Sequence, residues 1–429
     1  MNKRFLAYLG MAVVFFMVLS PMAFAEPQST PNGPWVEDEQ FVSLQGIMTN
    51  AELYKKLEQI EHTSKGRMEL EIVGYSDAIN GDLMEPLGYP LYLCKFGEPD
   101  PNSNKFRVLI TSQIHGGEVL GTQALVKIMQ KFAGGSKETN EILENVTLWL
   151  MPRVNPEGAM SERDGEWYPT RRNHQIWDPV FWGLPAGTRS PWYYRSSSEG
   201  YDLNRDSNPN LDFRIENLSD YGWTLEEFAE DILEDRNMNN SRYGGYYVNP
   251  EARIITGVYQ RLEPDVYIDV HHRGFNYLTE EDIRSVSIQV AAEVADPYTD
   301  PFSGDYYEVD ADVLELARQV NVVGYQALQR GFSHYGAIQK YPTVNLPGTT
   351  LGTFALNDTA IMLIEIKGQT QNLGQKQSGM LTQTAVVSIN EILKALADGT
   401  IYDVDPKLYD DIPPSANRMR DPSQRDDEF

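Results

Sequence analysis

The residues of this 429-residue chain with the clearest chemical potential are a few histidines, glutamates and arginines. His115 and Glu118 stand three positions apart in a His-Gly-Gly-Glu turn, and the adjacent His271 and His272 follow an apolar run at 266–270. Two imidazoles and one carboxylate, with a fourth position left for water, are the ligand set of a catalytic zinc site. The sequence therefore predicts that His115, Glu118 and one of the later pair hold one metal ion.

The elements expected around the first two ligands bring them to one point. His115 directly follows an apolar strand predicted over 106–114, and Glu118 opens a helix predicted over 118–132. The two glycines between them let the backbone turn sharply. Ligands often gather outside the carboxyl ends of strands in open α/β sheets, so we expect both side chains above that strand end.

The third ligand has two candidates. Successive side chains of a strand point to opposite faces, so only one of His271 and His272 can bind the same ion. Asp269 lies two residues before His271 and shares its face, where its carboxylate can orient the imidazole.

Glu365 is a lone carboxylate inside the apolar run 361–366. Such a group is costly to bury unless it has a partner or a chemical role. A salt bridge to Lys367, on the same face of the strand, is the structural interpretation. Beside a metal site, a general base acting on water is the better interpretation.

Arginines supply the remaining chemistry. Arg205 follows Asn204, and an arginine fork with a neighbouring amide suits both oxygens of a carboxylate. Arg171 and Arg172 form a second cation pair, one of which can stabilise an oxyanion. Each is also compatible with an ordinary surface arginine. Together with the metal ligands, these residues predict metal-assisted hydrolysis of an amide bond next to a carboxylate.

Alternating strand and helix patterns predict an α/β fold with a mixed, mostly parallel twisted sheet flanked by helices. The expected strands cover 68–74, 90–96, 106–114, 146–151, 266–270 and 361–366, and the expected helices cover 50–60, 118–132, 312–330 and 388–397. Residues 160–250, rich in Trp, Tyr, Pro and Gly, indicate long loops that either wall a site or form a surface insertion.

The chain start indicates a secretory signal. Lys3 and Arg4 precede an apolar run at 5–19, and Ala23-Phe-Ala25 is a small-residue cleavage site. The run is shorter than the ~20 residues that span a bilayer, so cleavage is preferred to an uncleaved anchor. We therefore expect a secreted or periplasmic protein without stable membrane association. The expected organisation is a signal peptide (1–25), a polar leader (26–47), one catalytic domain (48–400) and a mobile or surface-draped acidic tail (401–429).

Composition limits the partners. Acidic residues outnumber basic ones by 62 to 36, giving a formal net charge of -26. So acidic a surface argues against nucleic acid and anionic membranes. Solubility explains the charge most simply, and attraction of cationic substrates is the alternative. The only cysteine, Cys94, permits no intrachain disulfide.

In their order along the chain, these motifs resemble those of the zinc metallocarboxypeptidases of the carboxypeptidase A type. The resemblance extends over about residues 48–396. The matching motifs are His115-Gly-Gly-Glu118, Val154-Asn-Pro-Glu-Gly158, Thr170-Arg-Arg-Asn173, Asp202-Leu-Asn-Arg205, Asp269-Val-His271 and Leu363-Ile-Glu365.

The resemblance implies one zinc ion held by His115, Glu118 and His271. It further implies that Glu365 takes a proton from the zinc-activated water and passes it to the leaving amine. Arg171 stabilises the oxyanion, while Asn204 and Arg205 grip the free C-terminal carboxylate of a peptide substrate.

Some features depart from the family pattern. Tyr335 and Tyr341 are both candidates for the tyrosine that covers the substrate, and neither is assigned. The stretch 348–354 is small and apolar without an acid, which argues against a preference for Lys or Arg. The alternative function is a related zinc amidohydrolase or deacylase acting on acylated amino acids or cell-wall peptides. A zinc-free binding module is disfavoured because every ligand and the base are present.

Overall fold

The computed structural model describes residues 44, 46–78, 82–195, 200–232, 243–273, 278, 286–331, 338–367 and 374–415. The predicted signal peptide and nearly all of the polar leader lie outside the described residues. So do His334 and Tyr335. No helix among the described residues is long and apolar enough to cross a membrane.

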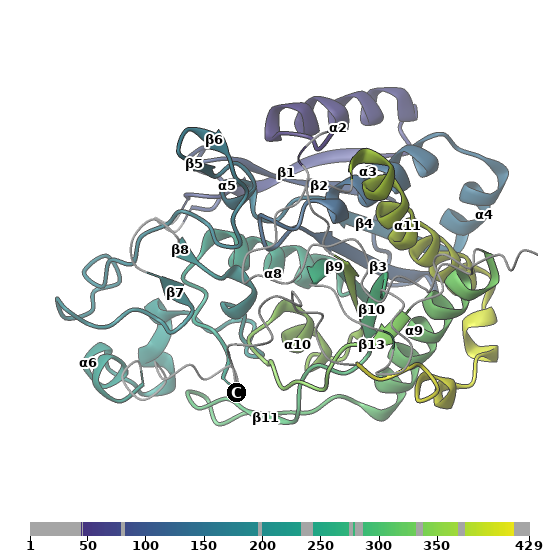
Figure 1. The fold of residues 1–429 in the computed structure, drawn as a ribbon. Helices are drawn as coiled ribbons and strands as arrows, with labels where there is room; N and C mark the ends of the chain where they lie inside the picture. The colour runs from purple at the N-terminus through teal and green to yellow at the C-terminus, as the bar shows by residue number, and fades with distance from the viewer. Residues whose placement is uncertain are drawn as a thin grey trace, which may run out of the picture.

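The centre of the molecule is an eight-stranded mixed sheet (Figure 1). Across the sheet, the strands are β1 (Glu69–Tyr75), β2 (Pro90–Phe96), β4 (Val146–Met151), β3 (Phe106–Ser112), β9 (Val266–Arg273), β14 (Ala360–Lys367), β10 (Ile288–Ala291) and β13 (Ile338–Lys340). The pairs β4–β3, β3–β9, β9–β14 and β10–β13 are parallel, and the other three pairs are antiparallel. The predicted mixed, mostly parallel sheet is confirmed.

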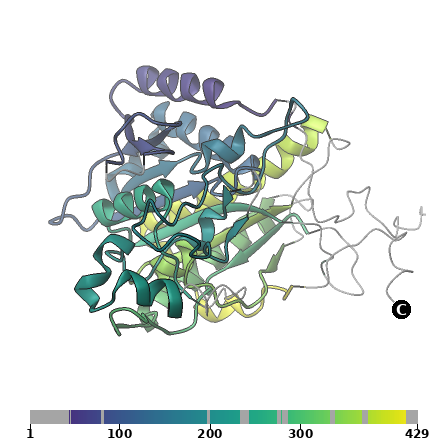
Figure 2. The ribbon, with the colours of Figure 1, turned by 90° about the vertical axis from the view of Figure 1, so that its left-hand side faces the viewer.

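Helices cover both faces of this sheet (Figures 1 and 2). One face carries α2 (Asn50–Ser64), α3 (Leu120–Ala133), α4 (Lys137–Asn145), α9 (Ala311–Gly331) and α11 (Gly374–Asp398). The other face carries α8 (Pro250–Leu262) and α10 (Thr350–Ala355).

Successive residues of the central strands alternate between two apolar cores. Ile268 of β9 lies in the core under α3, α9 and α11, whereas Tyr267 lies in the core under α8 and α10. The same alternation turns Asp269, His271 and Glu365 toward the side of α8 and α10. His271 and Glu365 are also direct neighbours in the parallel register of β9 and β14. The sheet thus places these carboxylates and the imidazole together.

The 160–250 region has an aromatic core of its own, and its loops also wall the cavity described below. Its buried rings include Tyr193, Phe213 and Tyr246. Buried Asp206 accepts hydrogen bonds from the Tyr193 hydroxyl (2.6 Å) and from the Asn249 backbone (2.7 Å). Residues 160–250 therefore both wall a site and form an insertion with its own small core.

Several element boundaries differ from the sequence prediction. Thr49 caps α2 through a reciprocal capping box with Glu52, while the first helical residue, Asn50, donates its side-chain amide to Pro156 O (3.0 Å). Helix α11 begins well before the predicted 388, and α8 was not predicted. The described part of the predicted tail contributes Tyr409 and other side chains to the main core.

Candidate active site

A cavity of about 1120 Å³ opens at the carboxyl ends of β3, β9 and β14. Its walls come from stretches of chain that are far apart in sequence. Every site residue predicted from the sequence lines it, namely His115, Glu118, Arg171, Arg172, Asn204, Arg205, His271, His272 and Glu365. Parallel strands explain this convergence, because their carboxyl ends meet at one edge of the sheet.

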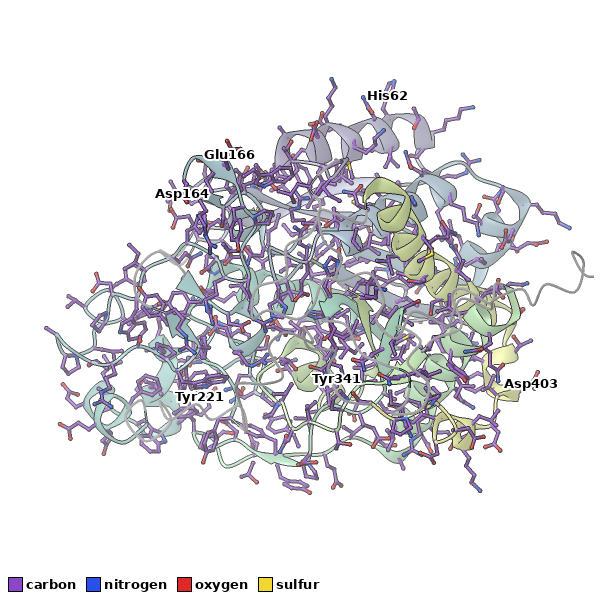
Figure 3. All side chains as sticks on the ribbon, in the orientation of Figure 1. His62, Asp164, Glu166, Tyr221, Tyr341 and Asp403 are labelled. Carbon is purple, nitrogen blue, oxygen red and sulfur yellow. The ribbon has the colours of Figure 1, made fainter. Side chains whose placement is uncertain are left out.

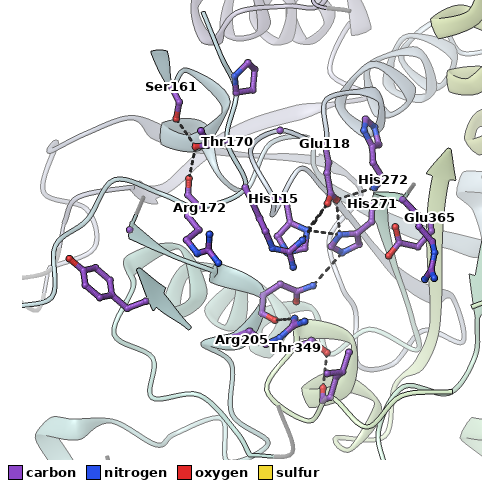
Figure 4. A pocket seen from close by; sticks show the side chains of 18 of the residues that line it. His115, Glu118, Ser161, Thr170, Arg172, Arg205, His271, His272, Thr349 and Glu365 are labelled. Carbon is purple, nitrogen blue, oxygen red and sulfur yellow. Dashed lines mark hydrogen bonds and ion pairs between the residues drawn. The ribbon is translucent and has the colours of Figure 1, made fainter. Parts of the chain in front are cut away.

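Three of these side chains point toward one another (Figure 4). His115 Nδ1 lies 2.8 Å from Glu118 Oε1, and His271 Nδ1 lies 2.9 Å from Glu118 Oε2. The two Nδ1 atoms are 3.2 Å apart. One ligand atom from each residue lies within 4.8 Å of the others.

This geometry fits a divalent metal ion. Two ligands held at about 2.0–2.1 Å by a tetrahedral zinc ion stand roughly 3.3 Å apart, which is close to the separation of the two Nδ1 atoms. Two imidazole lone pairs facing each other at this distance repel unless a cation or a proton lies between them. The donor set of two imidazoles and one carboxylate is also the set that zinc accepts.

Close backbone approach explains the glycine that follows His115. A Cβ atom on Gly116 would lie 2.2 Å from the carbonyl carbon of Gly158, so no larger residue fits there. The φ angle of Gly116 is not in the left-handed region. Glycine is therefore required here by the lack of space and not by the backbone conformation. The turn can therefore lie directly against the Asn-Pro-Glu-Gly segment.

Each clustered imidazole presents Nδ1 because a carboxylate occupies its other nitrogen. His115 Nε2 donates to Asp202 Oδ1 (3.2 Å), and His271 Nε2 donates to Asp269 Oδ2 (2.7 Å). Asp269 is itself fixed by a hydrogen bond from Thr111 Oγ1 (2.7 Å). Such outer carboxylates set the tautomer and orientation of metal-binding histidines.

Charge reinforces the cluster. Burial alone raises the pKa of Glu118, but the imidazoles of His115 and His271 hold that pKa well below its ordinary value. Burial alone lowers the pKa of His271, yet the carboxylates of Asp269 and Glu118 hold it well above its ordinary value. The carboxylates of the cluster therefore stabilise a positive charge placed between them, whether a proton or a metal ion.

The imidazole of the neighbouring His272 does not point to the cluster but binds a backbone group. His272 Nε2 accepts the backbone N–H of Leu120 (2.9 Å), the first residue of α3. This bond caps the helix in place of a side chain at Val119, and it explains why the helix begins at Leu120 and not at Glu118. Of the two candidates, His271 alone presents a ring nitrogen to the cluster.

Glu365 is nearly enclosed beside this cluster. Its side chain is 9 % exposed, and its Oε2 atom has no hydrogen-bond partner. Burial raises the pKa of Glu365 to about 8. No ion pair joins Glu365 to Lys367 within the described part of the chain, so the alternative salt bridge is absent. Glu365 nevertheless lines the cavity, so its carboxylate can meet a molecule bound there.

The predicted arginines occupy distinct positions. Arg171 Nε donates to Asp202 Oδ2 (2.8 Å), and its side chain is 42 % exposed to the cavity. Arg205 donates to the backbone oxygen of Asn204 (2.5 Å), and no carboxylate of a described residue lies within ion-pair distance of it. Burial lowers the pKa of Arg205. A partly buried cation without a direct ion pair to a described residue is suited to receive an anion.

Two further residues line the cavity. His174, which was not predicted as a site residue, lines the cavity with its Nε2 2.5 Å from Ser161 Oγ. The unassigned Tyr341 also lines the cavity, with the Arg273 guanidinium 4.7 Å from its ring centre (Figure 3). His62, by contrast, projects from the outer surface of α2 (Figure 3).

Comparisons with known proteins agree on one family, the carboxypeptidases. A family model described as zinc carboxypeptidase matches residues 54–279, just over half of the chain. Carboxypeptidase 2 of Trichophyton tonsurans is 33 % identical over 59 residues, which cover 14 % of this chain and 11 % of that protein. The chain thus spans about a tenth of the length of the curated relatives that it matches.

Solved structures share the fold at low sequence identity. Thrombin activatable fibrinolysis inhibitor aligns with a TM-score of 0.51 and 16 % identity, covering 83 % of this chain and 75 % of that one. Carboxypeptidase A from Helicoverpa armigera aligns with a TM-score of 0.50 and 15 % identity, covering 82 % and 74 %. At these identities the likeness shows a common fold.

Proposed function

Because the chain belongs to the zinc carboxypeptidase family, we propose that it hydrolyses the C-terminal peptide bond of peptides with one bound zinc ion. The observation that carries this proposal is the convergence of His115 Nδ1, the Glu118 carboxylate and His271 Nδ1 at one end of the cavity. These three residues would hold the ion.

A zinc ion at this place would supply Lewis acidity, polarising the scissile carbonyl and making a water molecule more acidic. The Glu365 carboxylate, which lines the cavity, accepts the proton of the attacking water and later delivers it to the leaving amine. A cation in the adjacent cluster also favours the ionised form of Glu365, which a base requires.

Positive side chains complete the proposed reaction. The Arg171 guanidinium, oriented by Asp202, stabilises the negative charge that develops on the carbonyl oxygen. Arg205 receives the free carboxylate of the substrate, and Asn204 beside it supplies an amide. Asn204 is positioned by Thr350, whose backbone N–H donates to Asn204 Oδ1 (3.2 Å). This clamp makes the enzyme an exopeptidase.

The deciding experiment combines metal analysis with a peptide assay. We expect about one zinc per chain, loss of activity on chelation, and recovery when zinc is returned. Peptides with a free C-terminus should release their last amino acid, and the same peptides with an amidated C-terminus should not. Release of the acyl group from N-acylated amino acids, with no cleavage of peptides, would support a deacylase instead.

The base is tested by Glu365→Gln. This variant should lose at least about a thousandfold in kcat while retaining zinc, because the amide cannot accept the proton. Glu251→Gln, which changes another buried carboxylate outside the proposed site, is the matched control and should retain activity. Normal rates in Glu365→Gln would remove Glu365 from the mechanism.

The proposed extent and location follow from the sequence. We place the catalytic domain at 48–400 and propose that residues 1–25 are removed on export to the periplasm or medium. Sequencing the N-terminus of the exported protein tests the cleavage site. A mature chain that begins at Met1 would contradict this assignment.

A further inference from the structure

A network of buried hydroxyl groups lies behind the candidate metal cluster. Asp269, which accepts from His271 Nε2 (2.7 Å), also accepts a hydrogen bond from Thr111 Oγ1 (2.7 Å). The Tyr267 hydroxyl lies 2.7 Å from Thr111 Oγ1 and 3.0 Å from Thr350 Oγ1. The four side chains behind His271 are fully buried, and none of them belongs to the described lining of the cavity. They can therefore act on a substrate only through the residues that they hold.

The sheet explains why these groups meet. Thr111 of β3 and Asp269 of β9 are direct neighbours in the parallel register, and Tyr267 lies two residues before Asp269 on the same face. Thr111 gives its only hydroxyl proton to Asp269, so its oxygen accepts the proton of Tyr267. Burial raises the pKa of Tyr267 well above its ordinary value, which keeps this proton on the phenol. The Asp269 carboxylate is thus held from behind by two hydroxyl groups in series.

The same tyrosine also touches the helix that positions the proposed clamp. Thr350 is the first residue of α10, and its backbone N–H donates to Asn204 Oδ1 (3.2 Å). Phe354, one turn later on the same side of the helix, packs its ring edge-on against the Tyr267 ring at a centroid distance of 4.9 Å. Tyr267 therefore contacts α10 through its hydroxyl and through its ring, whereas Asn204 depends on the first turn of that helix.

We propose that Tyr267 is a positioning residue that fixes the metal site and the clamp relative to each other. Through Thr111 and Asp269 it orients the metal-binding imidazole, and through Thr350 it holds the amide of Asn204 in place. This inference rests on the proposed function, in which the scissile bond and the terminal carboxylate of one residue must be bound together. Covalent geometry sets their separation, so a connection that holds both binding groups rigidly favours reaction. Buried hydrogen-bond networks supply such rigidity when each member has a partner.

The first test is the affinity for zinc, measured by competition with a chromogenic chelator in the absence of substrate. Tyr267→Phe removes one hydroxyl oxygen and leaves the ring contact with Phe354. Because Asp269 loses part of its support, we expect the zinc dissociation constant to rise by about three- to tenfold. An unchanged constant would overturn the inference.

Tyr259→Phe is the matched control. Tyr259 lies in the same apolar core, stacks on the same Phe354 ring at 3.9 Å, and has its hydroxyl 2.8 Å from Thr359 Oγ1. This variant loses the same atom from a buried tyrosine outside the network, so its zinc binding should match that of the native protein. An equal rise in both variants would show a general effect of packing and would overturn the role of Tyr267.

Variants of Thr111 test the route to the carboxylate. Thr111→Val removes the hydrogen bond to Asp269 itself and should raise the dissociation constant more than Tyr267→Phe does. Thr111→Ser keeps the hydroxyl and should bind zinc as the native protein does. Adding Tyr267→Phe to Thr111→Val should have little further effect, because both changes act through one contact. Additive effects would contradict the route through Thr111.

The clamp is tested with peptides at saturating zinc, where a weaker metal affinity no longer matters. We expect kcat/KM of Tyr267→Phe for a peptide with a free C-terminus to fall by about three- to tenfold, while Tyr259→Phe keeps the native value. Equal kcat/KM in the native protein and Tyr267→Phe would overturn the connection to Asn204. A native protein that binds zinc and releases no amino acid would overturn the proposed function instead, and the dissociation constants would still decide whether Tyr267 orients the metal site.

Discussion

At the scale of single residues, the chemistry of the site depends on which imidazole nitrogen is available. His115 and His271 both present Nδ1, because Asp202 and Asp269 occupy their Nε2 atoms. Asp269 is fully buried and is held in turn by Thr111. The ring orientation of His271 is therefore fixed by packing and hydrogen bonding before any ligand arrives.

Removing the carboxylate behind His271 should weaken metal binding. We expect Asp269→Ala to raise the zinc dissociation constant by roughly 10–100-fold, because the imidazole loses its orienting partner. Asp269→Asn keeps an acceptor, so its dissociation constant should change less. Competition with a chromogenic chelator measures the zinc dissociation constant of each variant. Asp265→Asn is the control, because Asp265 precedes the first residue of β9, at the end of the strand away from His271. An unchanged dissociation constant in Asp269→Ala would show that orientation by Asp269 is unimportant.

Residue types and spacing predicted the candidate ligands, Glu365 and the arginines because each requires a rare group in a recognisable setting. His174 could not be predicted in the same way, and Tyr341 could be named only as one of two candidates. Both reach the cavity through irregular loops, whose course depends on packing between distant segments and leaves no periodic signal. His271 and His272 were separable in sequence only by family pattern, whereas the sheet separates them by face.

At the scale of elements, strand prediction succeeded where apolar runs are continuous. β2 and β4 match their predicted bounds because both strands are almost wholly buried and end at polar or turn residues. Helix starts were less predictable. The start of α3 is set by His272 from β9, about 150 residues away, and local sequence carries no trace of such a partner.

Arg153 is a buried connection between elements that a substitution can test. Its guanidinium is 3 % exposed and donates to Gln113 Oε1, Asn50 Oδ1 and Met48 O at 2.7–2.8 Å. It thereby joins the start of α2 to the ends of β3 and β4. All three partners are uncharged acceptors, so burial lowers the pKa of Arg153 to about 10.

Arg153→Met should lower the free energy of unfolding by about 3 kcal/mol, because Asn50 Oδ1 and Met48 O are left buried without this donor. Urea unfolding followed by circular dichroism measures the change. Arg67→Met is the matched control, since the exposed Arg67 side chain donates, among the described residues, to Ser64 O alone (3.1 Å). Equal losses in the two variants would contradict the structural role given to Arg153.

A buried carboxylate on α8 should make stability depend on pH. Glu251 is fully buried, one of its oxygens lacks a hydrogen-bond partner, and burial holds its pKa well above the ordinary value. The native state therefore binds a proton that the unfolded chain has released above pH ~4.3. Stability from this group is complete below that pH and is lost as the pH rises toward the native pKa.

Glu251→Gln removes this dependence. The stability of the variant should therefore increase relative to that of the native protein as the pH rises from about 4 to 8. The difference in unfolding free energy should change by at most about 1.4 kcal/mol per pH unit. Denaturant unfolding at several pH values measures it. Glu157 and Asp206, whose burial also raises their pKa, are present in both proteins, so the difference reports on Glu251 together with its interactions with these two carboxylates. Parallel pH curves would contradict the assignment.

At the scale of the whole molecule, the candidate metal cluster joins segments that are remote in sequence. His271 lies 153 and 156 residues after Glu118 and His115. The intervening chain forms the aromatic core of residues 160–250 and walls the cavity. The number and order of the motifs made this closure predictable, but the shape of the enclosing loops was not, because it follows from packing of that aromatic core.

Binding of zinc should therefore stabilise the entire fold. An ion bound by the native state and not by the unfolded chain adds about 4 kcal/mol when its free concentration is a thousandfold above the dissociation constant. For a single domain of this size, we expect chelation to lower the melting temperature by several degrees. Differential scanning calorimetry of the chelated and zinc-restored protein measures this shift.

Non-specific binding must be separated from this effect, because a chain of net charge -26 attracts divalent cations over its whole surface. The same zinc additions to His271→Gln provide the separation. That variant keeps the surface charge but loses one of the three converging ligand atoms, so its melting temperature should barely respond to zinc. A response equal to that of the native protein would place the stabilising ion elsewhere, and the hydrolytic proposal would lose its physical basis.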